Sequence, residues 1–166
     1  MKTLSVITLL AAALTVQTKP NFSGAWTVIP DPKAAPAPAN PQLAMLTTGA
    51  WGNEFKIAQD DKTLVVTRSV RGTETVDTFS LDGAPVKSEA QGQLGGPTAI
   101  TSTAKWQGNK LVLDQSSATN MMGNNITMGV KVVLSLEKDG TMTMETTRSG
   151  GAIARPPVVT RYKKGT

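Results

Sequence analysis

The residue types that do chemistry in most enzymes are sparse in this chain of 166 residues, which contains neither histidine nor cysteine. Without an imidazole there is no Ser-His-Asp triad and no histidine metal site, and without a thiol there is no thiolate nucleophile or disulfide. One nucleophile pattern remains, a Ser-x-x-Lys spacing at Ser102 and Lys105. That mechanism needs both residues on one face of a helix. Residues 98–106 (TAITSTAKW) are instead typical of a strand, which would place the two side chains on opposite faces.

Carboxylates and thioethers are the remaining groups able to catalyse a reaction or bind a metal. Asp77 and Asp114 are expected in mid-strand, whereas four other aspartates occupy expected hairpin turns, where turn geometry accounts for them. Met142 and Met144 share one strand face; thioethers bind Cu(I), but methionine is also an adaptable core filler. We therefore predict no catalytic residue, no metal site and no cofactor. The turn aspartates are Asp60, Asp61, Asp82 and Asp139.

The charge balance is mildly basic, with 17 Lys and Arg residues against 12 Asp and Glu residues and a net charge of +5. Nucleic-acid-binding proteins gather basic residues on one face and interleave aromatic residues. Here the basic residues are scattered singly among acids, and the only dense run is residues 161–164 (RYKK). We expect no nucleic-acid partner.

The first 18 residues have the pattern of a secretory signal peptide. Lys2 precedes an apolar run over residues 4–14 (LSVITLLAAAL), which is shorter than the roughly 20 residues that span a bilayer. We expect cleavage near residues 13–18 and a mature domain over residues 19–166, periplasmic or secreted, with no integral membrane segment. The oligomeric state is left open.

Alternating apolar residues predict β-strands in the mature chain. The clearest case is residues 126–136 (ITMGVKVVLSL), in which every second residue is apolar on one face. Gly, Asn and Asp separate the strand-like segments at the short intervals typical of antiparallel hairpins. The predicted strands are residues 22–29, 54–59, 63–70, 73–81, 99–106, 110–117, 126–136, 141–148 and 158–163.

One segment interrupts this series of hairpins. Residues 30–50 begin with a proline-rich stretch that cannot donate to a strand ladder. Asn40 is then placed as a helix N-cap with Pro41 at the first helical position, which predicts a short helix after the first strand. Closing the sheet into a barrel would remove its two exposed edges.

A resemblance supports closure. Residues 21–26 (NFSGAW) resemble the Gly-x-Trp signature that opens the lipocalin and wider calycin families, and the layout of the chain is similar to that of small exported bacterial lipocalin-like proteins. The resemblance implies an all-β, lipocalin-like antiparallel up-and-down β-barrel of about eight or nine strands. It also implies that Trp26, next to Gly24, closes the barrel floor, and that Arg161 lies across the indole ring.

The leading functional expectation is non-enzymatic binding of a small apolar or amphipathic ligand inside this barrel. Concave apolar surfaces are the usual sites for such ligands. Trp51 follows the segment that could cover the barrel mouth and shares strand parity with Phe55. The predicted cavity or mouth residues are Leu43, Met45, Leu46, Trp51, Phe55, Met128, Val130, Val132, Met142 and Met144.

The alternative expectation is a barrel packed solid, a structural or interaction module of the cell envelope that acts through its loops. Bulky inward residues would favour this module. An empty interior of roughly several hundred Å³ would favour ligand binding.

Overall fold

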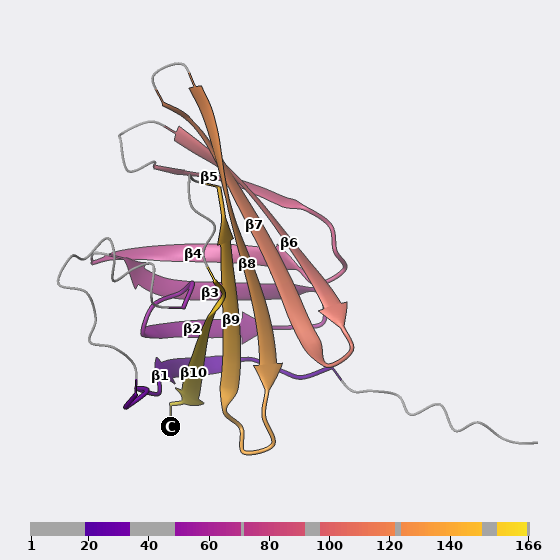
Figure 1. Cartoon of the computed structure of the whole chain (residues 1–166). Helices are drawn as coiled ribbons and strands as arrows, with labels where there is room; N and C mark the ends of the chain where they lie inside the picture. The colour runs from indigo at the N-terminus through magenta and orange to yellow at the C-terminus, as the bar shows by residue number, and fades with distance from the viewer. Residues whose placement is uncertain are drawn as a thin grey trace, which may run out of the picture.

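The computed structural model describes residues 19–33, 49–70, 72–91, 97–121, 124–150 and 156–165, and all regular structure in them is β-strand (Figure 1). The short helix predicted near residues 41–46 lies outside the described residues. In the described part of the chain, no helix is long and apolar enough to cross a membrane. The strands are β1 (Gly24–Val28), β2 (Glu54–Gln59), β3 (Thr63–Val70), β4 (Thr73–Ser80), β5 (Val86–Gln91), β6 (Pro97–Gln107), β7 (Lys110–Met121), β8 (Asn124–Leu136), β9 (Met142–Ser149) and β10 (Val158–Lys164).

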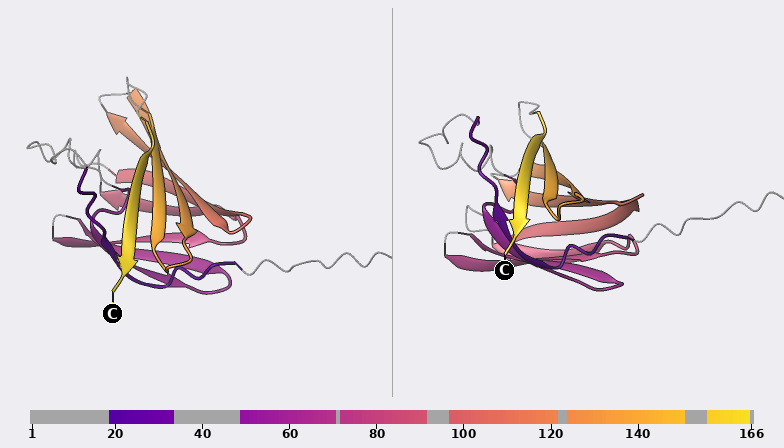
Figure 2. Two further views of the ribbon diagram at one scale, coloured as in Figure 1. Left: turned by 60° about the horizontal axis from the view of Figure 1, so that its bottom comes forward. Right: turned by 90° about the horizontal axis from the view of Figure 1, so that it is seen from below.

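The ten strands form one antiparallel sheet in the order β4-β3-β2-β1-β10-β9-β8-β7-β6-β5. Consecutive strands pair in up-and-down fashion, and β1 pairs with β10, so that the sheet curls into a nearly closed barrel (Figures 1 and 2). Closure is incomplete at one place. β4 and β5 follow each other in the chain, and β4 lies beside β5 and β6, yet no ladder joins it to either. We call this place the seam.

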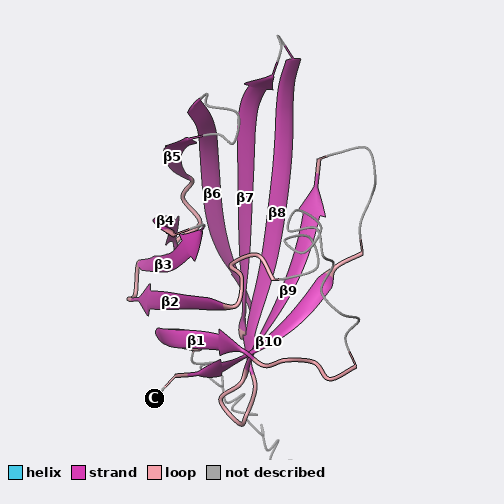
Figure 3. Ribbon diagram, turned by 90° about the vertical axis from the view of Figure 1, so that its left-hand side faces the viewer, coloured by secondary structure: helices cyan, strands magenta, loops and turns pink. Residues whose placement is uncertain are grey.

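The strand count is ten rather than the expected eight or nine, because β5 was not predicted. Its sequence, VKSEAQ, carries charged and small residues without apolar alternation. This composition suits a strand that is paired on one side only and is largely exposed. Strands β7 and β8 are also longer than predicted, and Figure 3 shows β6, β7 and β8 extending well beyond the level of β1 and β2.

The inner face of the barrel is apolar and closely packed near the β6–β7 and β8–β9 hairpins. Strand alternation and register bring large inward side chains from most of the strands into one core. Because side chains with no exposed surface border no water-sized space, this end of the barrel is filled. Core side chains without exposed surface are Phe22, Leu64, Val66, Leu111, Leu134, Met142, Met144 and Tyr162.

Two segments outside the strands complete this core. Before β1, Phe22 stacks on Trp106 with ring centroids 6.3 Å apart, and its carbonyl accepts a 2.9 Å hydrogen bond from Trp26 Nε1. Before β2, residues 49–53 dock on β9 and β10: the amide of Ala50 donates to Thr146 Oγ1 at 3.2 Å, and Tyr162 donates its hydroxyl proton to the Gly52 carbonyl at 2.8 Å. Phe22 therefore covers the core at the β6–β7 hairpin end, and residues 49–53, which lie beside the end of β1, cover it from the opposite side.

Replacing Leu134 with alanine should lower the free energy of unfolding by about 2–5 kcal/mol, because it leaves a cavity among side chains with no free space around them. Chemical denaturation followed by tryptophan fluorescence measures the loss. Thr127→Ala, on the exposed face of the same strand, is the matched control and should change stability by about 0.5 kcal/mol or less. Equal effects of the two substitutions would contradict a packed core at Leu134.

Candidate functional site

On the inner face of the barrel, the side chains change from mainly apolar to mainly polar at the first inward position beyond the packed core. Ala104, Leu113, Val132 and Thr146 form the last buried row across β6–β9. The next inward row consists of Ser102, Gln115, Val130 and Arg148, in direct register on the same four strands. In this row only Ser102 is fully buried, and the other three are partly exposed. We call this row, with the inward residues that join it from β3 and β4, the inner polar layer.

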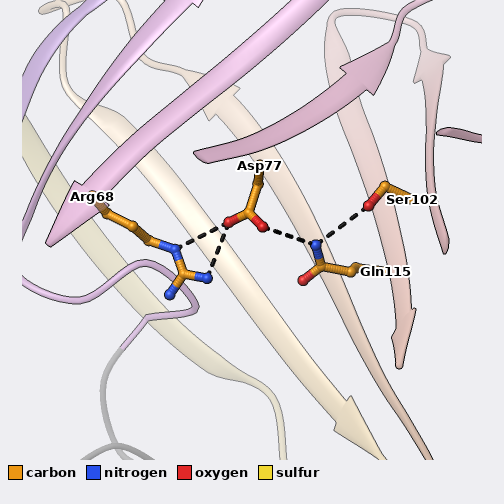
Figure 4. Close-up of polar contacts among 4 residues, drawn as sticks. All are labelled: Arg68, Asp77, Ser102 and Gln115. Atoms are coloured by element: carbon orange, nitrogen blue, oxygen red, sulfur yellow. Dashed lines mark hydrogen bonds and ion pairs between the residues drawn. The ribbon is translucent and has the colours of Figure 1, made fainter. Parts of the chain in front are cut away.

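Four side chains of this layer form a continuous hydrogen-bonded group, which we call the polar clasp: Arg68, Asp77, Gln115 and Ser102 (Figure 4). Asp77 Oδ2 accepts a 3.0 Å hydrogen bond from Arg68 Nε and lies 3.0 Å from Arg68 Nη2. Asp77 Oδ1 accepts from Gln115 Nε2 at 3.1 Å, and the same nitrogen donates to Ser102 Oγ at 3.3 Å.

The polar clasp bridges the seam. Arg68 and Asp77 belong to β3 and β4 on one side, and Ser102 and Gln115 belong to β6 and β7 on the other. The hydrogen bond from Gln115 to Asp77 therefore joins two parts of the sheet that no backbone ladder connects directly. Side chains supply the connection that backbone groups supply elsewhere in the barrel.

The burial of Asp77 explains why these partners are needed. Its exposed fraction is 8%, and a carboxylate with so little contact with water is stable only when it is paired and hydrogen-bonded. The Arg68 guanidinium, 21% exposed, supplies the opposite charge, and the Gln115 amide supplies a further donor. Among the described residues, no buried side-chain nitrogen or oxygen atom lacks a hydrogen-bond partner.

Tyr162 lies in the packed core on β10, opposite Met142 in the register. Its ring packs edge-on against Phe55, with centroids 4.9 Å apart, and Phe55 packs in the same way against Trp51 at 5.1 Å. Burial raises the pKa of the Tyr162 phenol to about 12, a hydrogen bond with the Thr160 side chain and the nearby charge of Arg148 opposing the shift. Tyr162 therefore stays protonated over the whole physiological range and acts as a hydrogen-bond donor.

The predicted cavity residues separate into three groups. Trp51, Phe55, Val132, Met142 and Met144 are at most 6% exposed and lie in the packed core. Val130 is partly buried on the inner polar layer, and Met128, one step further towards the open end, is 50% exposed. The predicted mouth residues Leu43, Met45 and Leu46 lie outside the described residues.

The floor of the barrel holds Trp26 as expected, but the basic residue over its indole ring is Lys164 and not Arg161. The Lys164 ammonium lies 5.9 Å from the Trp26 ring centroid. The register pairs Trp26 directly with Lys164, so that Arg161, three residues away, is on the opposite, exposed face of β10. Gly24 has a φ of 144°, and a Cβ there would collide with the Lys164 side chain.

The catalytic patterns in the sequence do not come together in the structure. Ser102 is 3% exposed on the inner face and hydrogen-bonded to Gln115, whereas Lys105 is exposed on the outer face, as the strand prediction required. Asp77 is inward and paired, while Asp114 is exposed on the other face of the sheet. Among the described residues, no group of three acidic residues is placed to hold a metal ion.

Sequence reasoning missed Arg68, Ser102 and Gln115 as members of one site. Strand parity was available as a signal: Arg68 is two and four residues from the buried Val66 and Leu64, and therefore faces inward. What parity cannot give is the meeting of β3 and β4 with β6 and β7 across the seam, because no hairpin connects those pairs.

Removing the Asp77 carboxylate should destabilise the fold, because the Arg68 guanidinium would then remain partly buried without its partner. We expect Asp77→Ala to lower the free energy of unfolding by about 1–3 kcal/mol, and Asp77→Ala with Arg68→Met to cost less than the sum of the single changes, by about 0.5–3 kcal/mol. Urea denaturation of the four proteins in this double-mutant cycle measures the coupling. Additive effects would show that the two side chains act independently.

Tyr162 is the only tyrosine in the chain, so phenolate absorbance reports on it alone. The folded protein should titrate with a midpoint at about pH 12, against 10.0 for an ordinary phenol in the unfolded chain. Because the folded pKa is raised, folded chains keep a proton that unfolded chains lose, and stability should fall as the pH rises from 10 towards 12. A midpoint near 10 in the native protein would mean that the phenol is accessible to solvent.

Comparisons with known proteins reveal a likeness of fold without a sequence family. No family model and no curated protein sequence matches the chain. Among solved structures, the REP1-NXSQ fatty acid transporter matches over 87% of this chain and 96% of its own, with 16% sequence identity and a TM-score of 0.53. A mutant of the fluorescent protein UnaG matches over the same shares of both chains, with 19% identity and a TM-score of 0.47. The first likeness shows a shared β-barrel fold.

Proposed function

We propose that this protein is an exported, non-enzymatic binding protein that holds a small amphipathic molecule in the open half of its barrel. The observation that carries the proposal is the division of the inner face into a packed apolar floor and an inner polar layer that solvent reaches. A site with apolar walls and a few fixed polar groups is the usual form of a small-molecule pocket.

The inner polar layer supplies the polar end of such a site. In the polar clasp, Arg68 directs Nε and Nη2 to Asp77, and Gln115 uses one nitrogen for both Asp77 and Ser102. The Gln115 carbonyl oxygen and the Ser102 hydroxyl proton remain as an acceptor and a donor in this set of contacts. A ligand is therefore proposed to place its polar end towards the polar clasp.

The apolar part of the ligand would lie towards the open end. Val130 and Val158 face inward with partial exposure, and Met128 extends the same face beyond them. Trp51, Phe55, Val132, Met142 and Met144 would then act as the floor that limits how deep a ligand enters, rather than as its direct contacts. Leu43, Met45 and Leu46 remain proposed entrance residues.

Export and the absence of catalysis are parts of the same proposal. Export is supported by the charged start and short apolar run of residues 1–18. A purely binding role is supported by the position of Asp77, which is committed to Arg68 while Asp114 lies on the other face of the sheet, so that these two carboxylates do not flank a common bond.

The packing of the barrel floor favours a second candidate, the structural or interaction module that acts through its loops. Large side chains without exposed surface fill the end of the barrel near the β6–β7 and β8–β9 hairpins, and residues 49–53 cover this core from the opposite side. In this case the polar clasp would serve only to hold the seam together.

Binding of anilinonaphthalene sulfonate, a fluorescent amphipathic anion, distinguishes the two candidates. We expect saturable binding of one dye per folded chain, weakened about tenfold or more by Val130→Glu, which places a carboxylate on the inner polar layer. Thr127→Glu is the matched control: it adds the same charge to the same strand on the exposed outer face and should leave the dye affinity within about twofold.

Native mass spectrometry of the protein from an exporting host, before any delipidation, tests the same point without a dye. A reproducible small-molecule adduct that is absent from the folded Val130→Glu variant supports interior binding. A clean mass, no uptake from a lipid extract and equal dye signals from both variants would refute interior binding and favour the packed module.

A further inference from the structure

The outer face of β6–β9 carries a hollow of about 400 Å³ that the interior site does not use. Eight of its ten lining residues alternate with the inward residues of these strands and point away from the core, and the other two are Gln115 and Val130 of the inner polar layer. We call it the outer hollow. Its outward residues lie on the opposite side of the sheet from the polar clasp, and Gln115 is the one residue that belongs to both.

Strand register arranges the polar groups of the outer hollow in order. Thr103, Asp114, Lys131 and Thr147 are direct neighbours across the four strands and form one row, about 14 Å long at the usual strand spacing. A second row, two residues further along each strand, has Gly129 in its middle and Ser149 at its end. Hydroxyl groups thus stand on both sides of one carboxylate and one ammonium group.

Gly129 marks the floor of the outer hollow. Glycine in the interior of a strand weakens it, and such glycines are found at bulges or where another group approaches the backbone closely. Gly129 is paired regularly on both sides, with Ser116 and Ser149, and its φ is not in the left-handed region. Neither a bulge nor backbone conformation requires glycine here. A Cβ here would meet Ser149 Oγ, the end of a side chain that can rotate away.

The charges of the outer hollow exclude several kinds of partner. One acid and one base leave it formally neutral, whereas phosphate-rich polymers require clusters of basic residues. Each of the strands β6–β9 is hydrogen-bonded on both edges, so a peptide cannot be captured by adding a strand.

We propose that the outer hollow binds an uncharged saccharide chain. Asp114 and Lys131 are both exposed, and neither forms an ion pair with another described residue. The carboxylate of Asp114 is therefore available to accept hydrogen bonds from a ligand, and the ammonium group of Lys131 is available to donate them. The flanking threonine and serine hydroxyls can both donate and accept hydrogen bonds. The length of the Thr103–Thr147 row suits a short oligosaccharide rather than a single sugar.

Affinity electrophoresis of the folded full chain tests the proposal, with dextran, galactomannan and xyloglucan as neutral probes and alginate as an anionic one. We expect retardation by at least one neutral polysaccharide, and Asp114→Asn or Lys131→Met should weaken it about tenfold or more. Glu145→Gln and Lys105→Met are the matched controls: both residues are exposed on the outer face beside the outer hollow and do not line it.

Each other outcome overturns the proposal. No retardation by any neutral probe would exclude saccharide binding of this kind, and retardation by alginate alone would show a simple cation effect of Lys131. Equal weakening in the control variants would place any binding elsewhere on the surface. Thermal denaturation of each variant confirms that it is folded before its mobility is compared.

Discussion

Asp77 is the residue on which the closure of this barrel depends. Every other neighbouring pair of strands is joined by a backbone ladder, but β4 and β5 are not, and the carboxylate of Asp77 connects the two sides of the seam through Gln115. A buried carboxylate so placed would be unstable without Arg68, and Arg68 in turn occupies an inward position next to Phe55 in the register. One charged group therefore organises the boundary between the packed floor and the inner polar layer.

This boundary gives the interior its functional character. Towards the β6–β7 and β8–β9 hairpins, inward residues are large and apolar, and the chain before β2 reaches this core from the opposite end, where it packs against Tyr162. Towards the open end, the same strands present Ser102, Gln115 and Arg148. The two proposed sites then use the two faces of the same four strands, the inner face for an amphipathic molecule and the outer face for a saccharide chain.

The sequence predicted the class of fold and most of the strands, since alternation and hairpin turns are local properties. It failed where the outcome depends on partners distant in the chain. β5 was not predicted because an exposed edge strand needs no apolar face, and its sequence therefore lacks the alternation that predicts a strand. Arg161 was predicted to lie over Trp26, whereas the register of β10 against β1 places Lys164 there, and the sequence alone does not give that register. Trp51 was expected at the mouth, but its contact with Phe55 and the docking of residues 49–53 bury it in the core.

The pairing of β1 with β10 has a consequence for the order in which the molecule takes shape. Trp26 lies opposite Lys164, so the two ladders that flank β1 come from the second strand and from the very last one. Hairpins such as β6–β7 need only local sequence, but the barrel cannot close until residue 164 is free to pair, and such long-range contacts form slowly. A growing chain that does not yet include β10 therefore has hairpins to form but no barrel, and it acquires an interior only when β10 can pair with β1.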